Sequence, residues 1–246
     1  MNNFFSNFRA ASYRGRTSSF KGIKNIDLIN ISDLLFLDDK FDILKSNINN
    51  FLNNKLYQHC LLSGAKGCGK TSLVKAVFND FINTKLRIVE IFKDDLKDLR
   101  YIIDDLENLN FYFILFLDDL SFNVNDDDYK LLKPIIDGGI ENLSNNIMFI
   151  VSSNYKNVLK NNNKNYQDAD FNDEMDDKFS LKERFGIWLN FYALNQEQYL
   201  KIVKSYFKNY ENDERLFKEA IEFSNLRASR NGRIAKQFCE IFKDKI

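Results

Sequence analysis

The chain has 246 residues, of which 44% are hydrophobic and 28% charged, a globular composition long enough for one α/β core and a small extra domain. Its 35 lysine and arginine residues balance 35 aspartate and glutamate residues, so net charge gives no support for binding to nucleic acid or to a membrane surface. No apolar run approaches the roughly 20 residues that span a bilayer, and three cysteines without metal-site spacing or a signal peptide favour a reducing cytoplasm.

Residues 1–27 form the first predicted segment, a basic arm that lacks a periodic apolar pattern. No acidic residue precedes Asp27, whereas basic residues occur at Arg9, Arg14, Arg16, Lys21 and Lys24. We expect an irregular arm that docks partly through Phe4, Phe5 and Phe8. An organelle transit peptide has a similar composition and remains the alternative.

The α/β core is predicted over residues 28–193, and its first helix over residues 40–53, where the apolar positions fit a helical stripe loosely. The short apolar stretch at residues 60–62 then predicts a buried strand, and residues 72–78 carry a helical apolar repeat. The loop between them reads G-x-x-x-x-G-K-T and consists of Gly64, Ala65, Lys66, Gly67, Cys68, Gly69, Lys70 and Thr71.

That spacing is typical of a loop that binds the phosphates of a nucleoside triphosphate. Its glycines let the backbone approach an anion, so that successive N–H groups can cradle the phosphates, aided by the positive end of the following helix. In such loops the lysine, here Lys70, reaches the β- and γ-phosphates, and the hydroxyl of Thr71 ligates Mg²⁺. A glycine-rich turn with a chance lysine is the alternative, but the strand before it and the helix after it favour the phosphate site.

Residues 86–91 and 111–117 are the next predicted strands, with a helix between them. The second run is continuously apolar and aromatic, which predicts a central parallel strand that ends in Asp118-Asp119. An acid in this position holds Mg²⁺, usually through water, so we predict Asp118 as the metal ligand and Asp119 as the residue that orients the attacking water. A solvated strand exit that carries two acids is the alternative.

Residues 147–151 predict another buried strand, which runs into Ser152-Ser153-Asn154. The Asn154 amide can hydrogen-bond the γ-phosphate or the attacking water, although an asparagine in this place is more often a turn residue. Before this strand, the acidic run 126–128 predicts a helix start rather than a cation site. Pro134 predicts either a kink in that helix or its restart at a first-turn position, and Gly138-Gly139 predicts its end. Residues 155–180, rich in asparagine and aspartate, predict a long mobile loop.

The chain after residue 180 predicts one last strand, over residues 188–192, and then helices alone. Asn195 and Gln198 predict a capping box at the start of the first helix, a second helix follows over residues 211–224, and a third opens at Gly232. We therefore expect a small helical lid over residues 194–246.

Taken together, these residues resemble an AAA+ ATPase over nearly the whole chain. The phosphate loop is similar to Walker A, residues 113–119 are similar to Walker B, and Asn154 stands at the sensor 1 position. Within the AAA+ proteins, the chain is most similar to a bacterial group classed as a domain of unknown function. That similarity is carried by residues 93–96, 118–122, 137–140 and 181–192. The resemblance implies an α/β P-loop NTPase fold, in which helices flank a central parallel sheet and a small C-terminal helical lid follows.

Two arginines take their expected roles from the resemblance alone. Arg184 sits where the family has its arginine finger, which in most members acts across a subunit interface and so implies a homo-oligomer. Arg233 is similar to the sensor 2 arginine of the lid, although Arg230 competes for that role. The usual Walker B pair is Asp-Glu, and the shorter carboxylate of Asp119 implies that turnover could be slow.

The expected function is Mg²⁺-dependent ATP binding and hydrolysis, coupled to movement of the lid and of a partner macromolecule. The expected catalytic residues are Lys70, Asp119, Asn154, Arg184 and Arg233. An ATP-gated binding module with incidental hydrolysis is the alternative, and a small-molecule kinase is a third. The expected partner is an unidentified protein; nucleic acid, through the basic arm, stays open without support from the net charge. Residues 34–37 could line an adenine pocket or pack into the core.

Overall fold

The computed structural model describes residues 1–120, 128–138, 142–154, 183–207 and 214–243. Their strands form one seven-stranded sheet in the order β2-β1-β4-β5-β6-β3-β7, which is parallel except for the β1–β2 pair. The strands are β1 (Ala10–Arg14), β2 (Ser19–Ile23), β3 (Cys60–Gly64), β4 (Leu86–Ile91), β5 (Tyr112–Leu117), β6 (Ile147–Ser153) and β7 (Ile187–Phe191). The predicted fold class, an α/β P-loop protein with a central parallel sheet flanked by helices, is confirmed.

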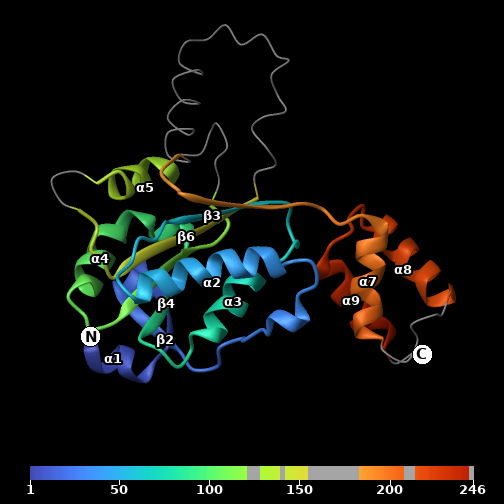
Figure 1. The fold of residues 1–246 in the computed structure, drawn as a ribbon, viewed down its shortest axis with the longest axis horizontal. Helices are drawn as coiled ribbons and strands as arrows, with labels where there is room; N and C mark the ends of the chain where they lie inside the picture. Colours follow the sequence, from blue (N-terminus) through green and yellow to red (C-terminus); the bar gives the residue numbers. More distant parts are fainter. Residues whose placement is uncertain (121–127, 139–141, 155–182, 208–213, 244–246) are drawn as a thin grey trace, which may run out of the picture.

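Helices cover both faces of this sheet, which gives three layers (Figure 1). The core helices are α1 (Asn2–Asn7), α2 (Asp38–Leu52), α3 (Lys70–Asp80), α4 (Leu99–Glu107) and α5 (Asp128–Ile136). Helices α2 and α3 share one apolar cluster with the sheet, whereas α1, α4 and α5 share another. Strands β5 and β6 are therefore buried on both faces, which explains why β5 and residues 147–151 of β6 are continuously apolar instead of alternating.

The N-terminal segment corrects an expectation, because residues 2–23 are not an irregular arm. Strand β1 pairs in parallel with β4 and extends the sheet, and β2 pairs with β1. The Phe5 ring of α1 is fully buried against Phe113, and the buried guanidinium of Arg87 donates from Nε to the Phe5 carbonyl at 2.6 Å. Strand β1 reads Ala-Ala-Ser-Tyr-Arg, so its strand conformation depends on a partner more than 70 residues away and not on its own apolar pattern.

The last three helices, α7 (Gln196–Tyr206), α8 (Glu214–Leu226) and α9 (Gly232–Phe242), pack on one another at one end of the molecule (Figure 1). They have an apolar cluster of their own, which includes Tyr199, Ala220 and Phe238. The predicted capping box is confirmed, since the Asn195 and Gln198 side chains and backbone N–H groups bond reciprocally. Helix α9 opens at Gly232, as expected.

Three predicted features lie wholly or partly outside the described residues. They are the mobile loop 155–180, the acidic helix start at 126–128 and the helix end at Gly138-Gly139. The predicted boundaries of the arm, the core and the lid stay predictions. Across the described ranges, none of the helices combines the length and the apolar character needed to cross a membrane.

Candidate functional site

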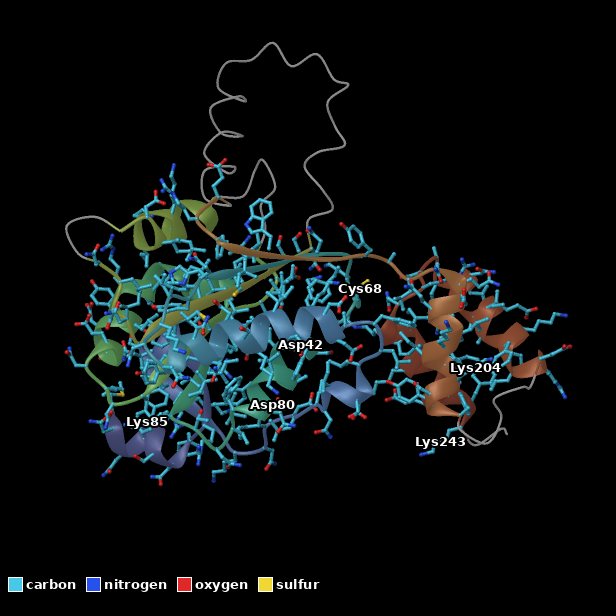
Figure 2. The ribbon with its side chains drawn as sticks, in the orientation of Figure 1. Asp42, Cys68, Asp80, Lys85, Lys204 and Lys243 are labelled. Carbon is cyan, nitrogen blue, oxygen red and sulfur yellow. The ribbon has the colours of Figure 1, made fainter. Side chains whose placement is uncertain are left out.

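A cavity of about 840 Å³ lies between the carboxyl edge of the sheet and helices α7 and α9. Because β3, β5 and β6 are parallel neighbours, the segments that follow them meet at this edge. The cavity is lined by the glycine-rich loop 66–69, the ends of β5 and β6, residues 33–37 and parts of α3, α7 and α9. Cys68 of the loop marks the place where the core faces the three C-terminal helices (Figure 2).

The glycine-rich loop connects β3 to α3 and wraps around its own lysine. The side chain of Lys70 is 6% exposed, and its Nζ donates to the carbonyls of Gly64 and Ala65, both at 2.9 Å, and to Asn154 Oδ1 at 3.0 Å. Burial lowers the pKa of Lys70 from its ordinary value. Gly64 has φ +141°, and a Cβ there would lie 1.9 Å from the Phe191 carbonyl oxygen, so the loop can follow β7 closely with glycine alone.

Thr71 and Asp118, the two predicted metal ligands, lie side by side. The Thr71 hydroxyl oxygen is 3.1 Å and 3.3 Å from the two carboxylate oxygens of Asp118. Hydroxyl and carboxylate oxygens are hard ligands of the kind that Mg²⁺ prefers, so this pair fits a magnesium ion. The described residues contain no group of three or more His, Cys, Asp or Glu side chains that could hold a metal. A metal here would therefore take its other ligands from water and phosphate, as Mg²⁺ commonly does.

Asn154 connects the loop lysine to the second acid. Its Oδ1 accepts from Lys70, and its Nδ2 donates to Asp119 Oδ1. Asp119 itself has φ +61°, in the left-handed region that is uncommon for residues other than glycine. Lys66 Nζ lies 3.9 Å from the other Asp119 oxygen, with both side chains more than half exposed. The carboxylate of Asp119 is thus held between the tip of β6 and the loop.

Ser152 is part of this arrangement, although no sequence motif singled it out. Its hydroxyl donates to Asp118 Oδ1 and accepts the backbone N–H of Asp119 at 2.9 Å, and the residue is 1% exposed. In a strand, residues two apart point to the same face. Ser152 therefore shares its side of β6 with Asn154, and that spacing is the signal that could have identified it.

The C-terminal helices bring one of the two candidate arginines to the cavity. Arg233 and Lys236, both on α9, line it. Arg230 is not among the described residues that line the cavity, and its Nη2 donates to Asn225 Oδ1 at 2.9 Å. Its Nε is buried and has no hydrogen-bond partner within the described part of the chain. The geometry thus favours Arg233 over Arg230, a choice that the sequence left open.

Arg184 is the predicted site residue that the structure does not bring to the others, since it is absent from the described residues that line the cavity. It precedes β7, whose far end reaches the loop, where the Ala65 N–H donates to the Phe191 carbonyl at 3.2 Å. At about 3.3 Å per residue, the four steps of β7 from Ile187 to Phe191 span about 13 Å, and Arg184 lies three residues before Ile187. Its Nε pairs with Asp137 Oδ1 at 2.8 Å. The length of β7 thus separates Arg184 from the loop of its own chain.

Residues 33–37 line the cavity, as do Ile202 and Tyr206 of α7. Leu34 and Leu37 also pack against the apolar cluster of α2 and α3, which is the core packing expected as one use of this segment. The adenine pocket, its other expected use, stays a prediction.

Comparison with known proteins identifies one family. The family model described as "Protein of unknown function (DUF815)" matches residues 6–246. No curated protein shows significant similarity to the sequence.

Among solved structures, the chain is similar to RuvB of Thermotoga maritima. A lysine-to-arginine RuvB mutant has a TM-score of 0.46 and 14% identity, covering 87% of this chain and 72% of the RuvB chain. A proline-to-glycine mutant has a TM-score of 0.44 and 16% identity, covering 90% and 73%. The structure titled RuvB Holliday junction branch migration motor has a TM-score of 0.42 and 15% identity, covering 83% and 69%. Similarity at this level does not transfer a function.

Proposed function

The chain belongs to the DUF815 family and has the fold of an AAA+ P-loop ATPase, and from this premise we propose that it binds ATP with Mg²⁺ and hydrolyses it. The observation that carries the proposal is the Thr71 hydroxyl 3.1 Å from the Asp118 carboxylate, beside a lysine enclosed by the glycine-rich loop. A hydroxyl, an acid and a lysine in this arrangement are the parts that P-loop enzymes use to bind a triphosphate with its metal.

Each residue of the cavity then has a proposed role. The loop N–H groups and Lys70 bind the phosphates, and Thr71 and Asp118 hold Mg²⁺, which when bound neutralises charge on the β- and γ-phosphates. Asp119 and Asn154 orient the attacking water. Asn154 suits this role because it already bonds both Lys70 and Asp119, so it lies between the phosphate lysine and the acid.

Two arginines complete the proposed mechanism, one from the chain that binds the nucleotide and one from a neighbouring copy. Arg233 of α9 would contact the γ-phosphate from the cavity wall that it lines. Arg184 would stabilise transition-state charge in the site of a neighbouring copy, because β7, about 13 Å long, separates it from the loop of its own chain. Such a contact is head-to-tail, so it generates a ring or an open helix of subunits.

The first test is steady-state hydrolysis of ATP by the purified protein. We expect phosphate release that requires Mg²⁺ and stops when the metal is chelated with EDTA, because the charge on the phosphates is then not neutralised. Binding of a fluorescent ATP analogue, measured in parallel, separates loss of binding from loss of chemistry. A protein that neither binds nor hydrolyses ATP with Mg²⁺ present would refute the proposal.

A second candidate, an ATP-gated binding module, is favoured by one observation. Asp119 is one methylene shorter than the glutamate usual in AAA+ proteins, and its two oxygens already contact Asn154 and Lys66. Slow hydrolysis would then set the lifetime of the ATP-bound conformation, which a partner recognises. ATP turnover measured with and without cell extract fractions distinguishes the candidates. An ATPase that acts on a partner is expected to turn over faster when a fraction supplies that partner, whereas a binding module with incidental hydrolysis is not.

Ser152 offers a second test of the metal site. Ser152→Ala removes a donor to Asp118 and the acceptor of the Asp119 N–H, and each unsatisfied buried group costs about 1–3 kcal/mol. We expect ATPase activity to fall about tenfold, with a higher Mg²⁺ concentration needed for half-maximal rate. Ser12→Ala is the matched control, a buried strand serine on β1. An unchanged Mg²⁺ dependence would mean that Ser152 does not position the acids.

The proposed partner is an unidentified protein, moved when the C-terminal helices change position. The separate apolar cluster of α7, α8 and α9 supports treating residues 194–246 as a lid on a core of residues 28–193. The RuvB structure is titled a Holliday junction branch migration motor, but the balanced charge of this chain gives nucleic acid no support.

A further inference from the structure

Asn231 is the N-cap of α9, and its side chain reaches the glycine-rich loop. The residue is 7% exposed, and its Nδ2 donates to the backbone carbonyl of Lys66 at 3.2 Å and to Ser229 Oγ at 2.8 Å. Its Oδ1 accepts the N–H of Ile234 at 3.0 Å, which is the cap bond of the helix. Because the cap requires the oxygen on that side, the amide nitrogen must face Lys66.

The contact is close enough to constrain the loop. Gly67 has φ +76°, and a Cβ there would lie 2.7 Å from Asn231 Oδ1, so a side chain at this position would displace the amide. A Cβ on Gly232 would likewise lie 3.6 Å from the Gly67 carbonyl oxygen. The start of α9 therefore lies directly against residues 66–67. The Cys68 thiol also approaches the Lys66 carbonyl, at 3.8 Å, but sulfur is a weak donor.

The hydrogen bond to Lys66 determines which way a neighbouring donor points. In a planar trans peptide the carbonyl and the following N–H point in opposite directions. When the Lys66 carbonyl is directed at Asn231, the Gly67 N–H is directed away from α9. In loops of this type, N–H groups that point inward bind the phosphates. A residue of the C-terminal helices thus orients a donor of the loop.

We propose that Asn231 is a positioning residue of the nucleotide site, which fixes the Lys66–Gly67 peptide so that the Gly67 N–H faces the phosphates. This inference rests on the proposed function and adds to it a direct link from α9 to the loop. Because loops of this type hold the α- and β-phosphates, which ATP and ADP share, Asn231 should affect both nucleotides. Arg233, as the proposed γ-phosphate contact, should favour ATP over ADP.

The test is Asn231→Ser, since serine keeps a good helix cap but is too short to reach Lys66. We expect the dissociation constants of ATP and ADP to rise by the same factor, about five- to tenfold, the equivalent of one hydrogen bond. KM for ATP should rise likewise, with kcat little changed. Asn195→Ser is the matched control, because Asn195 caps α7 in the same way and is not among the described residues that line the cavity.

A second variant keeps the test independent of the cap. Asn231→Asp retains the acceptor for Ile234 but cannot donate to a carbonyl, so we expect weaker binding than in Asn231→Ser. Unchanged affinity in either variant, or a loss for ATP without a loss for ADP, would overturn the inference. A loss matched by Asn195→Ser would also overturn it, because any weakened cap would then suffice. If the unmodified protein binds neither nucleotide, the proposed function itself fails.

Discussion

Replacing Arg184 with alanine is expected to abolish ATP hydrolysis, by roughly a thousandfold or more, while ATP still binds. The reason is geometric: Arg184 precedes β7, whose length of about 13 Å separates it from the loop of its own chain, so we expect it to stabilise the transition state in another copy. Its Nε is already paired with Asp137 at 2.8 Å. The terminal nitrogens are then the part of the guanidinium that would contact a phosphate. Phosphate release and binding of a fluorescent ATP analogue measure the two effects separately.

Mixing two inactive variants tests the same point more sharply. Asp119→Asn lacks the residue proposed to orient water but keeps Arg184, and Arg184→Ala has the opposite combination. In a mixed oligomer, an Arg184→Ala subunit can receive the arginine of an Asp119→Asn neighbour, so activity should return. Arg215→Ala, which changes an exposed arginine on α8, is the control and should behave as the unmodified protein. If Arg184→Ala hydrolyses ATP normally, or if the mixture stays inactive, the arginine does not act between subunits.

Replacing Lys70 with alanine is expected to weaken ATP binding by roughly a hundredfold or more, because a buried, hydrogen-bonded charge that meets the phosphates is lost. Isothermal titration with ATP and Mg²⁺ measures this directly. Lys75→Ala is the matched control, a lysine on the same helix whose Nζ pairs with Asp27 at 2.6 Å near the surface. Thermal unfolding of both variants checks that the sheet remains folded. Equal affinity of Lys70→Ala and the unmodified protein would contradict the assignment of the loop.

Much of the core could be predicted because its signals are local. The expected strand over residues 86–91 is β4, and the helical apolar repeat over residues 72–78 lies within α3, at Lys70–Asp80. The G-x-x-x-x-G-K-T spacing and the acids after a buried run identified the residues that line one cavity, since parallel strands bring their ends together. These predictions needed no knowledge of distant contacts.

The features that were missed depend on contacts between distant segments. Strand β1 is stabilised by β4, a partner that its own short sequence does not indicate. Asn231 shows in the sequence only as a residue before a helix, and its bond to Lys66 joins positions 165 residues apart. Ser152 lacked a motif, and whether Arg230 or Arg233 reaches the cavity depends on how the start of α9 and the residues before it lie against the core. Side-chain direction and long-range pairing therefore had to come from the structure.

The independent apolar cluster of α7, α8 and α9 has a mechanical consequence. Since these helices bury their side chains mainly against one another, a rotation of the three as a rigid body would leave both apolar layers of the sheet closed. The pivot would be the short link between Phe191 and Gln196, which the Leu194 N–H ties to the Arg230 carbonyl at 3.3 Å. Such a rotation would break a few hydrogen bonds and leave both packed bodies intact, so a small change at the loop could be converted into a large displacement at the far end of α8.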